Sequence, residues 1–170
     1  MRRSSMTLFS DPTCQFSHRV RIVLAEKGVT VEIENTETDC VTDEILEANP
    51  YGTLPTLVDR DLALYKSTVI MEYLDERFPH PPLLPVYPVS RAESRLWIYR
   101  IERDWCSLIP KIEVQDSDEA RTELRDSIVS IASIFDEMPY FMSEEFTLVD
   151  CCLAPLLWRL PSYSISLPKD

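Results

Sequence analysis

Glycine is nearly absent from this sequence. The chain of 170 residues contains only 2 glycines, whereas ordinary usage of ~7 % would give about 12. Nucleotide-binding loops of the P-loop and Rossmann types need several glycines at fixed spacings, because their backbone must approach the phosphates closely. The sequence therefore excludes both kinds of nucleotide site.

Basic residues are also scarce. Lys and Arg number 17 against 29 Asp and Glu, which gives a net charge of −12, and both halves of the chain are acidic. A surface of this sign repels nucleic-acid backbones and anionic lipids. Direct sequence-specific binding of DNA or RNA and binding to membranes are therefore disfavoured, and protein or small-molecule partners remain.

Two further absences concern cysteine pairing and membrane insertion. The 5 cysteines include no CxxC pair, so the sequence indicates neither a disulfide framework nor a zinc site, and no metal is expected. No run approaches the ~18 apolar residues of a membrane span. Residues 1–5 lead into a strand-like segment instead of a signal peptide. We expect reduced thiols and a cytoplasmic protein.

The first 80 residues alternate between strand and helix patterns. Strand-like runs occupy 6–10, 29–34, 56–58 and 62–65. Helical spacing occupies 16–27 before Gly28, a short stretch within 37–47, and a segment capped by Ser67. The order is β-α-β-α-β-β-α, with the first two strands parallel because a helix connects them. The half-buried run 29–34 and the hairpin at 59–61 complete a small α/β unit.

Five prolines between residues 78 and 88 interrupt any regular element, and beyond them the apolar spacing is helical throughout. Helices are expected at 90–112, 116–135 and 147–158, with capping boxes that open at Ser90, Asp116 and Thr147. We therefore expect a domain of residues 1–80, a linker at 81–89 and an all-helical domain at 90–170. Three helices make a thin bundle, so we expect either that further helices follow or that a dimer partner covers the gap.

This order of elements resembles the glutathione transferase superfamily, in which a thioredoxin-like domain precedes a helical domain. Residues 49–57, Asn-Pro-Tyr-Gly-Thr-Leu-Pro-Thr-Leu, are similar to the superfamily loop whose second proline, here Pro55, is cis. Residues 147–150, Thr-Leu-Val-Asp, resemble its capping box in the helical core. The resemblance implies an α/β thioredoxin-like domain followed by an all-α domain.

Longer blocks resemble the bacterial stringent starvation protein A family. They lie at residues 6–10, 20–28, 70–83 and 154–161. This resemblance implies a dimeric transcription regulator of starvation and stress that lacks transferase activity and needs no cofactor. It also implies binding to the RNA polymerase holoenzyme with its housekeeping sigma factor. Whether the dimer is a homodimer or a heterodimer with a related chain stays open.

Cys14 marks a candidate thiol site. It lies between the first strand and the first helix, where the positive end of the helix dipole favours a thiolate. One interpretation is a glutathione-dependent thiol transferase in which Cys14 reacts while Leu54, Pro55 and Ser67 hold the glutathione. The other is a vestigial glutathione site. Lys66 favours the second, because glutathione-binding relatives have an acidic residue before this serine, and its carboxylate helps to hold the γ-glutamyl group.

Residues 79–81 form the second candidate site. Prolines on both sides of His80 hold the backbone extended, so that the ring projects. The family resemblance implies that Pro79, His80 and Pro81, flanked by Tyr87, contact the protein partner. The prolines alone favour a strap between two domains, in which His80 is incidental. No Ser, Cys or carboxylate in sequence reach of His80 suggests a catalytic triad.

Three other features have simpler interpretations. His18 follows Cys14 by four residues, a spacing that a solvated helix face explains better than a metal or catalytic pair. Cys151 and Cys152 are adjacent in the chain, diverge in direction on a helix and are expected in the core. The acidic run 32–47 contains no Lys or Arg and is either a solvated face or a docking patch for a basic partner.

The main hypothesis from the sequence is therefore a non-catalytic, dimeric scaffold that regulates transcription by binding RNA polymerase. The alternative is the glutathione-dependent enzyme that uses Cys14. A third possibility is a sensor that binds a small ligand in the vacant glutathione cleft or at the dimer interface.

Overall fold

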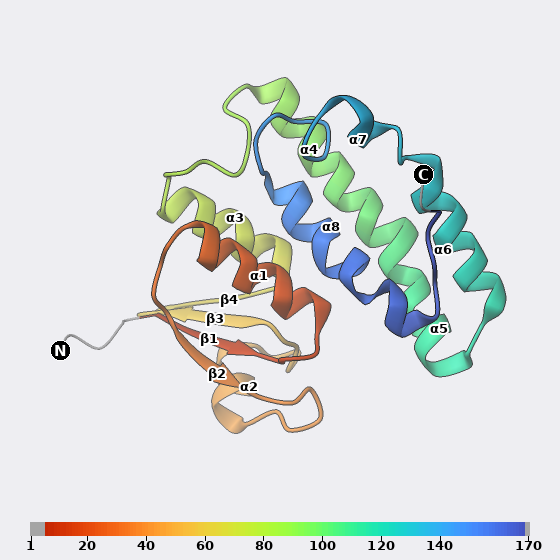
Figure 1. Ribbon diagram of the computed structural model, residues 1–170. Coiled ribbons are helices and arrows are strands. Elements are labelled where there is room, and N and C mark those ends of the chain that lie inside the picture. Colours follow the sequence, from red (N-terminus) through yellow and green to blue (C-terminus); the bar gives the residue numbers. More distant parts are fainter. Residues whose placement is uncertain (1–5, 169–170) are drawn as a thin grey trace. The chain divides into compact units, whose positions relative to one another are not determined.

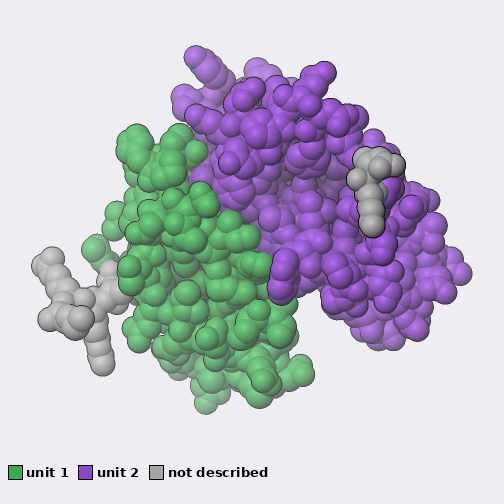
Figure 2. Space-filling model, viewed as in Figure 1, with its two compact units in different colours: residues 1–82 green, residues 83–170 purple. Residues whose placement is uncertain are grey.

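The computed structural model describes residues 6–168, and the chain divides into two compact units, residues 1–82 and 83–170 (Figure 2). The prediction that residues 1–5 are not a signal peptide concerns residues outside those that the structure describes. Unit 1 contains β1 (Met6–Ser10), α1 (Gln15–Glu26), β2 (Glu32–Asn35), α2 (Asp43–Ala48), β3 (Thr56–Asp59), β4 (Leu62–Tyr65) and α3 (Ser67–Arg77). Unit 2 contains α4 (Pro88–Arg100), η1 (Ile101–Trp105), η2 (Cys106–Leu108), α5 (Ile109–Gln115), α6 (Asp118–Ser130), α7 (Ile134–Glu137), α8 (Leu148–Arg159) and η3 (Leu160–Tyr163).

The strands of unit 1 form one mixed sheet in the order β2-β1-β3-β4. β1 runs parallel to β2, whereas β3 is antiparallel to both β1 and β4. The helices α1 and α3 lie on one face of the sheet, and α2 lies on the other side (Figure 1). The predicted order of elements is confirmed. The first two strands are parallel, as predicted, because α1 connects the end of β1 to the start of β2 at the opposite end of the sheet.

The core of unit 1 lies between the sheet and the two helices on its face. Leu8 and Leu57 from the strands and Val23, Ile70 and Leu74 from the helices are completely buried. Fully burying a side chain of this size contributes about 1.5–3 kcal/mol each. These positions include the apolar residues whose period predicted the strands and helices, so the pattern and the packing agree.

β2 differs from the prediction for residues 29–34. The strand begins at Glu32, and all four of its residues are exposed, including Ile33 at 43 %. Among residues 6–168, β2 is an edge strand with β1 as its one neighbour, and charged residues on an edge discourage pairing with another chain. Val29 and Val31 are half-buried and Thr30 is exposed, so the predicted alternation is present before the strand. It fails at Ile33, because alternation in the sequence does not show whether a helix covers the strand.

The start of α3 also differs from the prediction. Lys66, not Ser67, precedes the helix, and Ser67 is its first helical residue with its side chain buried. Lys66 has φ 68°, a region that side chains disfavour and that often marks functional sites. Ser67 is therefore not the helix cap that the sequence suggested.

The first long stripe of unit 2 belongs to four successive helical segments and not to one helix. Ile101, Trp105, Leu108 and Ile112 are all buried, as their spacing predicts. The winding changes from α to π at Ile101 and to 3-10 at Cys106. Trp105 packs inside the unit, and its indole N–H donates to Ser127 Oγ at 2.7 Å. A local change of winding keeps large side chains on one face where a uniform helix would not.

Two predicted capping boxes in unit 2 are wrong, and one is confirmed. α4 begins at Pro88, so Ser90 lies inside the helix, because proline fits the first helical turn. α6 is capped by Ser117, one residue after the predicted Asp116, and ends at Ser130, before Phe135. Thr147 caps α8 in a complete capping box with Asp150. Cys151 and Cys152 are fully buried, as predicted.

Candidate functional site

The segments of the predicted thiol site leave the sheet of unit 1 at one end. The register pairs Phe9 with Thr56 and Thr56 with Tyr65, so the end of β1, the start of β3 and the end of β4 are neighbours. The predicted site residues lie next to these strand ends: Cys14 follows β1, Leu54 and Pro55 precede β3, and Lys66 and Ser67 follow β4. Strand order therefore assembles pieces that lie up to 53 positions apart in the sequence.

Cys14 is the residue that precedes α1, and its thiol is half-buried and free of any disulfide. The backbone of Cys14 is extended, and its side chain makes no capping hydrogen bond with the first turn of the helix. Its peptide N–H donates to the carboxylate of Asp11 at 3.2 Å. The thiol thus lies at the helix start, as predicted, but beside a buried carboxylate that the sequence analysis did not anticipate.

Asp11 organises the loop between β1 and α1. Burial alone would raise the pKa of its carboxyl, but donors from Thr38, Thr13 and Cys14 lower this pKa from 3.8 to about 2. The Thr38 hydroxyl donates at 2.5 Å and the Thr13 hydroxyl at 2.7 Å. The loop therefore holds an ionised carboxylate next to Cys14. An Asp followed two residues later by Thr at a strand end is a local signal that could have indicated such a turn, although it was not used in the prediction.

Arg21 fixes the same loop from the side of the helix. Its guanidinium donates to Ser10 Oγ at 2.6 Å, to the carbonyl of Asp11 at 3.0 Å and to the carbonyl of Pro12 at 3.2 Å. A guanidinium is planar and has five N–H donors, so it can bind several fixed acceptors at once. Arg21 lies within a family-like block of the sequence, but nothing in the spacing revealed its role.

The loop before β3 has the geometry that the family resemblance implied. The Leu54–Pro55 peptide bond is cis. The side-chain amide of the fully buried Asn49 donates to the carbonyl of Thr53 at 2.9 Å and to Thr56 Oγ1 at 3.1 Å. Gly52 has φ 60°, and a Cβ there would lie 3.1 Å from a Leu46 methyl, so glycine is favoured at this position.

The proline loop, residues 79–82, is the second candidate site. Phe78 has φ −124° and ends α3, because a following proline disfavours the helical conformation. Pro79, His80 and Pro81 are exposed, and the His80–Pro81 bond is cis. The loop thus presents two proline rings and an imidazole to solvent, as the sequence predicted.

A buried ion pair lies beneath the proline loop. Lys27 Nζ donates to Asp75 Oδ1 at 2.6 Å and also to the carbonyl of Pro81. The Lys27 side chain is 0 % exposed and that of Asp75 is 6 % exposed. Neither residue was predicted from the sequence, since their meeting requires α1 and α3 to pack side by side.

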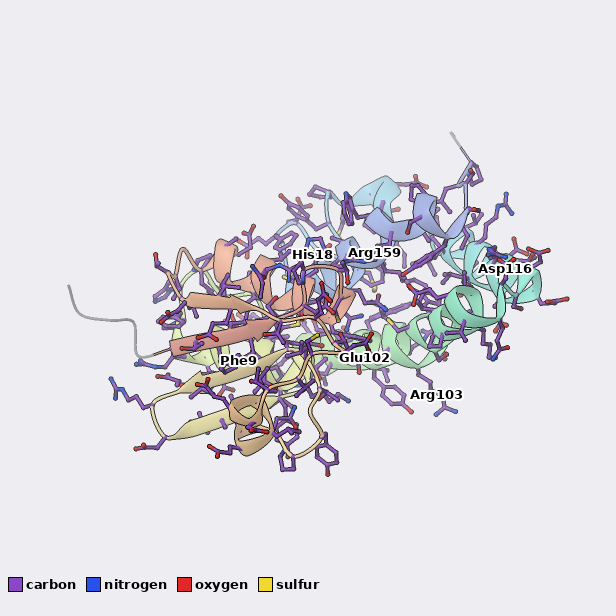
Figure 3. All side chains as sticks on the ribbon, turned by 90° about the horizontal axis from the view of Figure 1, so that it is seen from below. Phe9, His18, Glu102, Arg103, Asp116 and Arg159 are labelled. Carbon is purple, nitrogen blue, oxygen red and sulfur yellow. The ribbon has the colours of Figure 1, made fainter. Side chains whose placement is uncertain are left out.

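The remaining predicted residues do not join these two sites. Tyr87 belongs to unit 2, where it precedes α4 and is 77 % exposed. His18 lies on α1, one turn after Cys14 (Figure 3). Within residues 6–168 no group of three or more His, Cys, Asp or Glu side chains is placed to hold a metal ion. Cys14 and Lys27 flank α1 at its opposite ends, about 20 Å apart along the helix axis at 1.5 Å per residue.

Comparison with known proteins identifies the family. The model of the glutathione S-transferase N-terminal domain matches residues 8–82, and that of the C-terminal domain matches residues 96–170. The chain is 59 % identical over 167 residues to the stringent starvation protein A homolog of Pasteurella multocida, covering 96 % of this chain and 79 % of the relative. The chain belongs to the stringent starvation protein A family. The family homolog of Coxiella burnetii is 55 % identical and covers 99 % of this chain and 82 % of its own length.

Solved structures confirm the fold class. Rice GST1 in complex with glutathione superimposes with a TM-score of 0.87 at 24 % identity, over 97 % of this chain and 82 % of the rice chain. A thioredoxin-like domain and a helical domain are therefore established for this member of the stringent starvation protein A family. In the described part of the chain no helix combines the length and the hydropathy needed to cross a bilayer.

Proposed function

We propose that this protein is a stress-response regulator of transcription that binds the RNA polymerase holoenzyme with its housekeeping sigma factor. The proposal puts the contact at Pro79, His80 and Pro81, with Tyr87 as a flanking residue. Membership of the stringent starvation protein A family supports the regulatory role. The observation that carries the contact is the exposed proline loop, held from below by the buried pair of Lys27 and Asp75.

The chemistry of the loop suits protein recognition. Proline rings expose apolar surface on a backbone with few accessible conformations, so binding orders little that is not already ordered. The imidazole of His80 adds a donor, an acceptor and an aromatic face. These groups provide a compact set of apolar and polar contacts for a folded protein surface.

The charge of the chain defines the route by which it regulates transcription. A net charge of −12 opposes contact with DNA phosphates, so the protein acts through the polymerase. The exposed acidic strand β2 and the acidic segment that follows it form a second candidate contact for basic elements of the partner. Contacts of that kind weaken as salt concentration rises.

We further propose that the protein works as a dimer. Val89, Leu96 and Tyr99 lie on one side of α4 at spacings of seven and three residues, and their exposed fractions are 71 %, 58 % and 52 %. Arg103 continues this row, donates to the Tyr99 hydroxyl at 2.8 Å and extends away from the helices (Figure 3). An apolar row of this length on a solvated helix supports an interface between copies or with a related chain.

A second candidate function is a glutathione-dependent thiol transferase, favoured by the position of Cys14 at the start of α1. Against it stand the ionised Asp11 carboxylate beside Cys14 and the exposed Lys66 before Ser67. Calorimetric titration with glutathione separates the two functions. Micromolar binding with turnover that depends on Cys14 supports the enzyme, whereas absent or millimolar binding supports the scaffold.

A pull-down of RNA polymerase from cell extract tests the proposal. The triple variant P79A/H80A/P81A should lose the polymerase while it keeps its fold by circular dichroism and its oligomeric state. Pro12→Ala, which replaces an exposed proline at the other end of α1, serves as the matched control and should retain it. Unchanged capture by the triple variant excludes the proline loop as the contact. Repeating the capture over a salt series measures the share of charged contacts.

A further inference from the structure

The local sequence places Lys27 at the end of α1. Gly28 has φ 60°, its N–H donates to the Ala25 carbonyl at 3.0 Å, and the Val29 N–H donates to the Leu24 carbonyl at 3.1 Å. These two bonds form a Schellman motif, which ends a helix at a defined residue. Lys27 is therefore the C-cap of α1, and the point at which its side chain leaves the helix is fixed.

The side chain of Lys27 is fully buried, so its charge is stable there only if other groups of the protein compensate it. An ammonium taken from water needs an opposite charge and acceptors for its three N–H groups. The Asp75 carboxylate supplies the charge, and the Pro81 carbonyl supplies a second acceptor. The backbone of the proline loop is thus part of the coordination of a buried cation.

The proline loop has few means of holding its own backbone. Three of its four residues are prolines, which have no N–H to donate, so His80 carries the one backbone donor of the segment. Its carbonyls must take donors from elsewhere. Lys27 provides such a donor from α1, 54 residues earlier in the chain.

From this geometry we propose that Lys27 is a positioning residue for partner recognition. Its ammonium, compensated by Asp75, fixes the Pro81 carbonyl and so presents Pro79 and His80 in the conformation that the partner binds. The partner in this statement is the one of the proposed function, on which the inference rests. A loop already held in its bound conformation loses less entropy on binding.

The competing explanation is that the ion pair only packs α1 against α3. Two variants separate the explanations. K27M removes the ammonium beside the buried Asp75 carboxylate and should strongly destabilise the unit. K27M/D75L removes both charges and replaces them with apolar groups of similar size, which commonly restores stability. Both variants lack the donor to the Pro81 carbonyl. If Lys27 positions the loop, K27M/D75L should have an altered loop and weaker partner binding. If the ion pair only packs the helices, K27M/D75L should keep both the loop conformation and the binding.

Nuclear magnetic resonance reads the position of the loop without any partner. The sequence contains only 2 histidines, so the ring signals of His80 and His18 are easily assigned. In K27M/D75L the His80 ring signals should shift and broaden, while those of His18, on α1, stay in place. An unchanged His80 spectrum in K27M/D75L overturns the positioning role, whatever the partner does.

Binding of the purified RNA polymerase holoenzyme to the immobilised full chain completes the test. K27M/D75L should bind at least tenfold more weakly than the wild type although its urea midpoint is near that of the wild type. Wild-type affinity in K27M/D75L together with an altered His80 spectrum also overturns the proposal. If P79A/H80A/P81A binds normally, the proline loop is not the polymerase contact and that part of the proposed function fails. The spectrum of His80 still decides whether Lys27 positions the loop.

Tyr73→Phe is the matched control on α3. It removes the hydrogen bond that the Tyr73 hydroxyl donates to Asp59 at 2.6 Å and leaves Lys27, Asp75 and the proline loop intact. It should lower the urea midpoint without changing polymerase affinity or the His80 spectrum. A loss of affinity in Tyr73→Phe equal to that in K27M/D75L would mean that binding follows stability, and the positioning role is then wrong.

Discussion

Thr38 donates its hydroxyl to the carboxylate of Asp11 at 2.5 Å, and so ties the acidic segment after β2 to the loop that precedes Cys14. The contact joins residues 27 positions apart. The same carboxylate also accepts the backbone N–H of Thr38 at 3.2 Å. Two short loops at the thiol end of the sheet therefore depend on a single ionised group.

The first prediction concerns stability at low pH. Hydrogen bonds lower the pKa of Asp11 from 3.8 to about 2 although burial opposes them, so the folded state binds this proton later than the unfolded state. The resulting stability, about 2 kcal/mol, is present above pH 3.8 and is lost as the pH falls towards 2. Asp11→Asn should lose it at pH 7. Urea unfolding of both proteins between pH 7 and 2 measures the difference, and parallel pH profiles would contradict it.

The second prediction separates the contribution of Thr38. Thr38→Val removes the shortest of these hydrogen bonds and should lower the unfolding free energy by about 1–2 kcal/mol at pH 7, because a hydrogen bond to a charged group is lost. Thr30→Val, at an exposed position outside any strand, should change it by less than about 0.5 kcal/mol. Equal effects of the two variants in urea unfolding would show that the Asp11 contact contributes nothing.

The third prediction concerns glutathione. Lys66 is exposed and precedes the buried Ser67, where the family resemblance implies an acidic residue in glutathione-binding relatives. We expect Lys66→Glu to raise glutathione affinity at least fivefold, because a carboxylate replaces a positive charge facing the γ-glutamyl ammonium. Calorimetry measures this, with Lys111→Glu in unit 2 as the charge-matched control. A gain equal to that of the control indicates a general charge effect instead.

The fourth prediction concerns the capping box of α8. Asp150 accepts the N–H of Phe141 and of Thr147, each at 2.9 Å, and the Thr147 hydroxyl at 3.1 Å. Asp150→Ala should lower the unfolding free energy by about 3–5 kcal/mol, since it leaves buried donors without partners. Thr147→Ala should cost about 1 kcal/mol, as is usual for a cap. Chemical denaturation checks the order of the two, and the reverse order is incompatible with this network.

The fifth prediction concerns the apolar row on α4. Leu96→Glu should convert the proposed dimer into a monomer at micromolar concentration, because a charge would be buried against an apolar surface. Val114→Glu changes an 82 % exposed residue on α5 and should leave the dimer intact. Sedimentation equilibrium gives the masses. A Leu96→Glu dimer as stable as the wild type would place the interface elsewhere.

Local sequence motifs predicted some features of the thiol site but not others. The position of Cys14 at the helix start and the cis bond before Pro55 were predicted from short motifs, and the structure has both. The role of Asp11 was not predicted. It depends on Thr38, which the chain reaches only after α1 and β2. Neither spacing nor composition reveals a partner at that separation.

Prediction failed where a neighbouring residue could perform the same local role. The sequence offered Ser67, Ser90 and Asp116 as helix starts, and the helices begin after Lys66, Tyr87 and Ser117 instead. Serine and aspartate favour caps, but proline fits the first turn of α4. Asp116 is instead the left-handed residue that ends α5. Thr147 succeeded because its box satisfies buried donors that have few alternatives.

The sequence by itself determined the order of helices and strands, the end of α1 at Gly28, the capping box at Thr147 and the exposed proline loop. Each follows from residues within a few positions of one another. The sparse glycines fit this account, since Gly28 and Gly52 both have φ 60°. Only the tertiary structure decided that β2 is uncovered and that Lys27 meets Asp75 and Pro81. Those relationships depend on strand order and on the packing of α1 against α3, which bring together side chains about 50 residues apart.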